Sequence, residues 1–144
     1  AERRRYANRV SGPLLDRMDL QIRVAREEDL GLFSAGEAEH SAAVFERTSD
    51  ARRRQLARQG TPNSELRGRR LLDACSLTGD ERRLIERATQ TLHLSKRAAE
   101  RSLRVALTIA DLGNADRVDV SCLREALAYR AVLDGGMTTT AGPA

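Results

Sequence analysis

Residues 95–113, SKRAAERSLRVALTIADLG, repeat apolar and charged residues with the period of an α-helix. One face of such a helix is apolar, with Ala98, Ala99, Leu103, Val105, Ala106, Ile109 and Ala110. The opposite face is a polar stripe made of Arg97, Glu100, Arg101, Arg104, Thr108 and Asp111. Ser95 is the expected N-cap and Gly113 stands just past the end. The apolar face has to be buried, so the rest of the chain is expected to pack around this helix.

Other helices are expected on both sides of this one. A helix from Ser41, its candidate N-cap, is closed by Gly60 and Pro62, and its apolar stripe of Val44, Thr48 and Ala51 is thin. We expect three more helices: a short one at Leu66–Leu72, one that starts with the capping box Thr78-Gly-Asp-Glu81 and runs to about Leu92, and a final one from about Ser121.

Residues 20–24, LQIRV, alternate apolar and polar side chains and predict a short strand. A lone strand has unpaired edges, so it must join a sheet elsewhere. The predicted class is therefore mainly α: a helical bundle preceded by a strand-containing remnant of an α/β core. We expect the remnant and a connector at 1–40, the helical domain at 41–134 and a disordered tail at 135–144.

Composition excludes several classes of protein. With 144 residues the chain is long enough for one core, and no apolar run approaches the ~18 residues that span a bilayer. No secretory signal is recognisable, so a cytoplasmic location is expected. Cys75 and Cys122 are far apart and predict two buried thiols, and His40 and His93 lie in no catalytic or metal-binding pattern. We expect no metal site.

The basic residues point towards anions but define no phosphate loop. Lys96 is the single lysine among 25 basic residues, and it follows Ser95 and precedes Arg97, so the Gly-Lys-Ser/Thr of a Walker A motif is absent. A pI near 9.8 permits contact with nucleic acid, yet two Phe, two Tyr and no Trp leave little to stack on bases.

Four segments carry a family resemblance: RVSGPLLDRMDLQIRV (9–24), SAAVFERTSDARRRQLARQGTPNSEL (41–66), LSKRAAERSLRVALTIADL (94–112) and VDVSCLREALAYR (118–130). Together they resemble the C-terminal part of magnesium-chelatase-like AAA+ ATPases. The Ser-Gly-Pro before Leu-Asp-Arg and the Ala-Leu-x-Tyr-Arg ending are most similar to the ComM/YifB subgroup. The likeness covers nearly everything except the last dozen residues. Thr48, Cys122 and the tail depart from the family pattern.

The resemblance implies a role for Arg17. In related ring ATPases an arginine at this position is an arginine finger, which reaches in trans to the ATP of a neighbouring subunit and stabilises charge developing on the γ-phosphoryl group. Arg9 is the second candidate for the finger. From spacing alone, the alternative is a surface ion pair of Arg17 with Asp16 or Asp19.

The resemblance also implies that Arg97 is the sensor 2 residue, contacting the γ-phosphate in cis from the first turn of its helix. Arg101 and Arg104 are then expected in salt bridges. The alternative is a solvated helix face on which Glu100 pairs with Arg104.

The family further implies a parent chain that binds ATP and Mg²⁺, assembles as a homo-oligomeric ring, a hexamer, and moves DNA junctions by branch migration in recombination and natural transformation. Walker A, Walker B and sensor 1 are expected upstream of Ala1. This piece alone should neither hydrolyse ATP nor retain a cofactor. Its expected partners are the upstream core, neighbouring subunits and DNA, with no membrane. Two alternatives remain: a magnesium chelatase subunit and a non-enzymatic, arginine-rich module binding DNA or protein.

Overall fold

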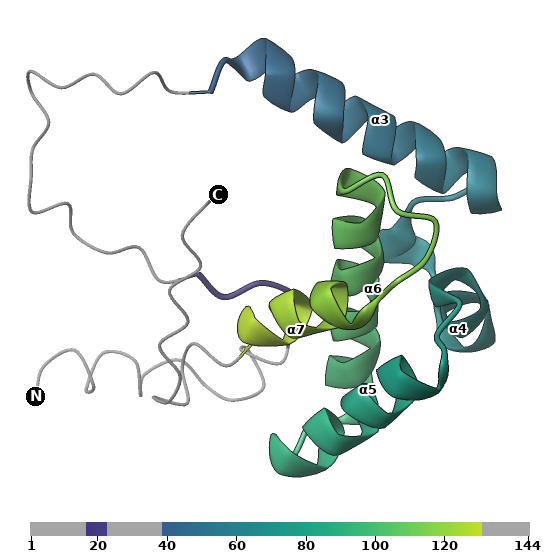
Figure 1. Cartoon of the computed structure of the whole chain (residues 1–144), viewed down its shortest axis with the longest axis vertical. Helices are drawn as coiled ribbons and strands as arrows, with labels where there is room; N and C mark the ends of the chain where they lie inside the picture. The colour runs from purple at the N-terminus through teal and green to yellow at the C-terminus, as the bar shows by residue number, and fades with distance from the viewer. Residues whose placement is uncertain (1–16, 23–38, 131–144) are drawn as a thin grey trace, which may run out of the picture.

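The computed structural model describes residues 17–22 and 39–130. Its elements, in chain order, are α3 (Ser41–Gln59), the 3-10 turn η1 (Asn63–Glu65), α4 (Gly68–Cys75), α5 (Gly79–Thr91), α6 (Lys96–Leu112) and α7 (Val120–Ala128). Figure 1 shows α6 at the centre, α7 crossing it and α3 leaning away from the other helices. The predicted helical bundle is confirmed.

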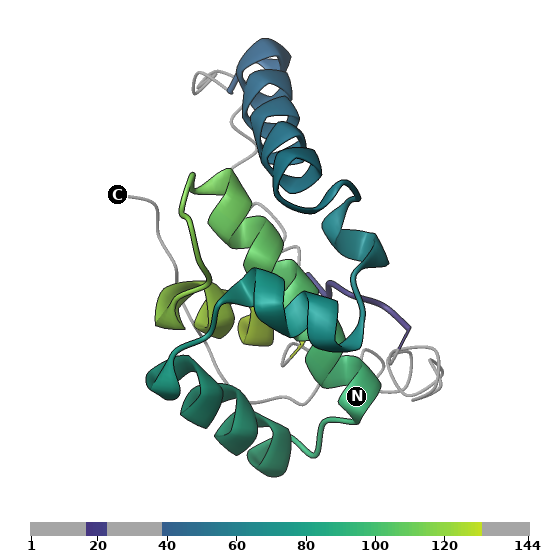
Figure 2. The same cartoon turned by 90° about the vertical axis from the view of Figure 1, so that its right-hand side faces the viewer.

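Helix α6 organises the core, as its two-sided sequence predicts. It packs against α3, η1, α4 and α7, while α5 packs against α7. In Figure 2, α4 lies in front of α6, which passes from the α3 side of the molecule to the α5 side. The core brings together the apolar residues of α4, α6 and α7 and of the segments between the helices: Leu66, Leu71, Cys75, Leu103, Ala106, Leu107, Ala110, Val118, Cys122, Leu123 and Ala126.

Two of the predicted helix starts are confirmed. The Ser95 side chain accepts a hydrogen bond from the Ala98 N–H at 3.1 Å, which caps α6. Thr78 and Glu81 form the capping box of α5. For α3 the predicted N-cap is off by one residue: the His40 carbonyl accepts the first helical bonds, so His40 is the N-cap and Ser41 the first helical residue.

The helix ends use left-handed residues that are not all glycine. Gly60 ends α3 with φ 74°, as predicted. Gly113 follows α6 but has φ −82°, and Asn114 is the left-handed residue, with φ 57°. The Ala115 N–H donates to the Ala110 carbonyl at 2.8 Å and closes a Schellman motif.

The strand predicted at 20–24 is not seen in the part of it that the structure describes. Residues 20–22 are in neither a helix nor a strand, and residues 23 and 24 lie outside the described ranges. The Gln21 N–H instead donates to the Tyr129 carbonyl at 2.9 Å. The physical reason is that the described residues offer no neighbouring strand to complete a ladder. The predicted tail at 135–144 and Arg9 also fall outside the described ranges.

Candidate functional site

The polar stripe of α6 changes character along the helix. Arg97, in the first turn, is exposed, whereas Arg104 and Thr108 are half-buried and Asp111, in the last turn, is buried. The alternative of a uniformly solvated face is therefore wrong for this helix. Other segments of the chain cover the stripe progressively towards its C-terminal end.

Asp111 is the centre of a buried polar network between α3, η1 and α6. Its carboxylate accepts two hydrogen bonds from Arg58, at 2.6 and 3.1 Å, and one from the Asn63 amide at 2.8 Å. The Asn63 N–H in turn donates to Gln55 at 3.1 Å. Because every carboxylate oxygen has a donor, the network is satisfied internally and fixes η1 between the helices.

Arg104 and Arg67 approach one another without an intervening carboxylate. Their Nη1 atoms donate to the same acceptor, the Leu66 carbonyl, at 3.1 and 2.8 Å. Burial lowers the pKa of Arg104 below its usual value, and the neighbouring Arg67 guanidinium lowers it further. The predicted salt bridge of Arg104 is not found: it forms no ion pair with any residue in the described ranges.

Arg97 lies one turn before Arg101 on the same stripe and is exposed. Its guanidinium makes neither a hydrogen bond nor an ion pair with the residues that the structure describes. The Ser95 cap orders the turn from which it projects. The side chain is therefore held on an ordered backbone while its charged end is available to an anion.

Arg17 is also exposed, but its backbone is anchored. Its carbonyl accepts a hydrogen bond from the Arg101 guanidinium, which also forms an ion pair with Asp19 at 2.9 Å. The predicted salt bridge of Arg101 is confirmed, with Asp19 as its partner. Of the two aspartates offered for a surface pair with Arg17, Asp19 is thus bound by Arg101, and Asp16 lies outside the described residues.

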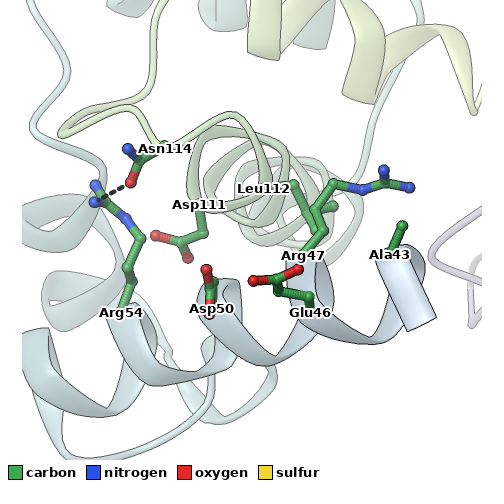
Figure 3. A pocket seen from close by; sticks show the side chains of 8 residues that line it. All are labelled: Ala43, Glu46, Arg47, Asp50, Arg54, Asp111, Leu112 and Asn114. Carbon is green, nitrogen blue, oxygen red and sulfur yellow. Dashed lines mark hydrogen bonds between the residues drawn. The ribbon is translucent and has the colours of Figure 1, made fainter.

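A hollow of about 370 Å³ lies between α3 and the C-terminal turn of α6 (Figure 3). Three carboxylates (Glu46, Asp50 and Asp111) and two guanidinium groups (Arg47 and Arg54) line it, along with Ala43, Leu112 and Asn114. Arg47 binds Glu39, Arg54 binds Asn114 at 2.7 Å, and Asp111 binds Arg58. An excess of carboxylates is unsuited to phosphate, and neither Arg17 nor Arg97 is among its lining residues.

The described residues offer little to other kinds of chemistry. They contain no group of three or more His, Cys, Asp or Glu that could hold a metal ion. Cys75 and Cys122 are both buried, as predicted, and burial raises the pKa of the Cys75 thiol to about 12. None of the helices in the described ranges is long and apolar enough to cross a membrane.

Known family models cover most of the chain. The model for the C-terminal region of magnesium chelatase subunit ChlI matches residues 38–130, and the model for subunit ChlI itself matches residues 1–31. The chain belongs to the magnesium chelatase ChlI family. The resemblance read from the four sequence segments is thereby confirmed, and the helices α3 to α7 are the helical lid of this family.

Similar proteins carry the names YifB and ComM. The chain is 42% identical over 130 residues to YifB of Salmonella typhimurium, 39% identical over 130 residues to the competence protein ComM of Haemophilus influenzae, and 38% identical over 130 residues to YifB of Escherichia coli. These alignments cover 89%, 90% and 89% of this chain and 26% of each relative. The chain thus spans about a quarter of the length of these ComM-like relatives.

Sequence reasoning missed two parts of this site. The role of Asp19 as the carboxylate for Arg101 depends on residues 82 positions apart and leaves no local pattern. The joint approach of Arg67 and Arg104 to the Leu66 carbonyl likewise joins η1 to α6 across 38 positions.

Proposed function

We propose that this chain is the lid-containing region of a ComM-like AAA+ ATPase. The parent protein assembles as a hexameric ring and uses ATP and Mg²⁺ to move DNA junctions in recombination and natural transformation. The upstream core of the same chain binds the nucleotide. The lid supplies Arg97 as sensor 2 in cis, and the segment before it supplies Arg17 as the arginine finger in trans.

The observation that carries this proposal is the exposed guanidinium of Arg97 in the capped first turn of α6, which has no partner among residues 17–22 and 39–130. Arg54, Arg58 and Arg101 bind carboxylates within the described residues. Arg97 binds none of them, so its charge on an ordered turn is suited to an external anion. The helix N-terminus adds its own partial positive charge. Together these features favour a phosphate group at this position.

Arg17 suits the second role for reasons of chemistry. A guanidinium keeps its charge at all working pH values and presents a planar set of donors to phosphate oxygens. Its backbone is fixed by Arg101 while its side chain remains exposed. A fixed backbone and a free side chain are what a group needs in order to reach a neighbouring subunit.

The test is an ATPase assay on a chain that includes the upstream core. Arg17→Ala is expected to lower kcat by roughly 10³ to 10⁵, the range reported for arginine fingers, and Arg97→Ala is expected to lower it as well. Arg83→Ala is the matched control, since Arg83 is an exposed arginine that pairs with Asp80 in α5. If neither Arg17→Ala nor Arg97→Ala lowers turnover, the proposed roles are wrong.

Subunit mixing separates action in trans from action in cis. A subunit with a defective Walker motif still donates its own Arg17, so adding it to Arg17→Ala subunits should restore activity. The same mixture with Arg97→Ala subunits should stay inactive, because each subunit type then lacks part of its own site. Recovery in the Arg97→Ala mixture would show that Arg97 acts in trans instead.

A second candidate, a non-enzymatic DNA-binding module, is favoured by the Arg67 and Arg104 pair, which lacks a carboxylate within the described residues. Phosphate neutralisation by such groups predicts DNA binding that weakens steeply with salt. DNA binding independent of nucleotide and unchanged by Arg97→Ala would support this candidate. The third candidate, a magnesium chelatase subunit, predicts nucleotide-dependent insertion of Mg²⁺ into a porphyrin with partner subunits.

A further inference from the structure

The segment Arg17–Ile22 is held on the lid by polar contacts rather than by buried apolar side chains. Met18, Leu20 and Ile22 are 43%, 49% and 67% exposed. The segment has no regular secondary structure and so gains no hydrogen bonds from a helix or a sheet. Its position on the lid must therefore depend on individual anchoring groups.

Arg101 of α6 is one of these anchors. Its side chain is 14% exposed, and its Nη1 atom donates both to the Arg17 carbonyl and to Asp19. A charged donor that is largely removed from water forms stronger hydrogen bonds than an exposed one. One atom of α6 thus binds the segment at two points, on either side of Met18.

The end of α7 supplies two further anchors. Arg130 Nη1 lies 3.3 Å from the Met18 carbonyl, and the Gln21 N–H donates to the Tyr129 carbonyl at 2.9 Å. The acceptor in both of these hydrogen bonds is a main-chain carbonyl. Figure 1 shows the segment running beside α7. Arg101 combines an ion pair with Asp19 and a hydrogen bond to the Arg17 backbone.

We propose that Arg101 is a positioning residue that fastens the Arg17 segment to α6, so that the finger residue moves as one body with the helix that carries Arg97. This inference rests on the proposed function. Arg101 and Arg97 are one helical turn apart on the same stripe. A displacement of α6 that follows nucleotide binding at one site is then transmitted to the guanidinium that serves the neighbouring site.

The activity test uses the intact ATPase with Arg101→Met, which keeps an unbranched apolar stem and removes the charge and the donors of the guanidinium group. Displacing a reacting group by about 1 Å can lower the rate about 10²-fold. The kcat should therefore fall by about that factor, while the KM for ATP stays within about 2-fold of the wild-type value. Arg101→Lys retains donors and charge and should recover most of the loss. Arg83→Ala should leave kcat unchanged.

A double variant distinguishes positioning from general damage. If Arg101 acts through Arg17, the kcat of the Arg101→Met, Arg17→Ala double variant should lie within about 2-fold of the kcat of Arg17→Ala alone. A multiplicative loss in the double variant would overturn the proposal, because Arg101 would then act independently of the finger.

Hydrogen exchange provides a readout that does not depend on catalysis. In the intact protein, Arg101→Met should speed exchange of the backbone amides at residues 17–22 and leave those of α5 unchanged. Unchanged exchange at 17–22 would overturn the proposal. Faster exchange at 17–22, combined with full activity of Arg17→Ala, would support the attachment of the segment by Arg101. It would show that only the proposed finger role of Arg17 is wrong.

Discussion

Arg58 and Asp111 form a two-point ion pair between α3 and α6, with Nη1 2.6 Å from one carboxylate oxygen and Nη2 3.1 Å from the other. The Asp111 side chain is fully buried, and the Arg58 side chain is 25% exposed. Apart from this pair, α3 buries only Ala51 and Gln55. The attachment of α3 to the bundle is therefore largely polar.

Removing the Asp111 carboxylate should destabilise the chain strongly. Asp111→Ala removes the only carboxylate that pairs with Arg58 in the described residues, together with one of the two acceptors of the Asn63 amide. Breaking one side of a buried pair typically costs ~3–5 kcal/mol in the free energy of unfolding. Urea denaturation measures this loss. Asp80→Ala is the matched control, because the Asp80–Arg83 pair is exposed and such pairs contribute ~0–1 kcal/mol. Equal losses in the two variants would contradict the structural role of Asp111.

His93 holds a backbone conformation that suits glycine. Its φ is 48°, and the Leu94 N–H donates to the Thr89 carbonyl at 3.0 Å, which gives α5 a Schellman ending. The left-handed conformation costs an L-residue ~1–2 kcal/mol, which glycine avoids, although glycine adds entropy to the unfolded chain. His93→Gly should therefore raise the melting temperature slightly. Gln90→Gly, inside the same helix, should lower it.

A lower melting temperature for His93→Gly would show that the imidazole makes a contact worth more than the backbone strain. No hydrogen bond of the imidazole is among the contacts of the described residues, and the residue is exposed.

The two thiols should be unreactive in the folded chain. Burial raises the pKa of Cys75 to about 12 and also raises the pKa of Cys122. Since the thiolate is the reacting form, Ellman's reagent at about pH 8 should modify neither cysteine until the chain unfolds. Both should react in concentrated denaturant, which is the internal control. Rapid modification of the folded chain would show that one of the helices α4 or α7 opens readily.

The helices were predictable because their signals are local. The two-sided pattern of residues 95–113, the Ser95 cap and the Thr78–Glu81 capping box each depend on residues within a few positions, and each is confirmed. The burial of Leu103 and Ala106 follows from the same pattern. Local hydrogen bonding and helical periodicity are enough to locate such elements.

The helix ends were harder to predict where another residue replaces glycine. Gly60 is left-handed and was found from its type, whereas Asn114 and His93 adopt the same conformation without the usual signal. Asn114 is stabilised there by Arg54, which binds its side chain and the Ala115 carbonyl, both at 2.7 Å. That support comes from α3, about 60 residues earlier in the chain, so no local pattern reveals it.

The candidate site was also predictable only in part. The family motif located Arg17 and Arg97, but periodicity placed Asp111 on the exposed stripe, whereas the structure buries it. Helical periodicity assigns residues to a face, and it does not say which neighbour covers that face. The pairing of Asp19 with Arg101 was missed for the same reason, since it depends on how the two segments pack.

Asp119 gives the chain a measurable dependence on pH. Its side chain caps α7 by accepting a hydrogen bond from the Cys122 N–H at 2.8 Å, and this bond, with another from Ser121, lowers the pKa of Asp119 from 3.8 to about 2. Because the pKa of Asp119 is lower in the folded chain than in the unfolded chain, the ionised carboxylate stabilises the fold at pH values above the unfolded-state pKa. That contribution is lost as the pH falls from about 4 towards 2.

Asp119→Asn keeps an acceptor at the cap and removes the titration, so the variant isolates this effect. Wild type should unfold at a higher urea concentration than Asp119→Asn at about pH 6, and the difference should vanish near the lowered pKa. Asp119→Ala removes the cap itself and should cost about 1 kcal/mol of unfolding free energy at about pH 6. Other carboxyl groups are common to wild type and Asp119→Asn and cancel in the comparison. A difference between them that stays constant as the pH falls would contradict the lowered pKa.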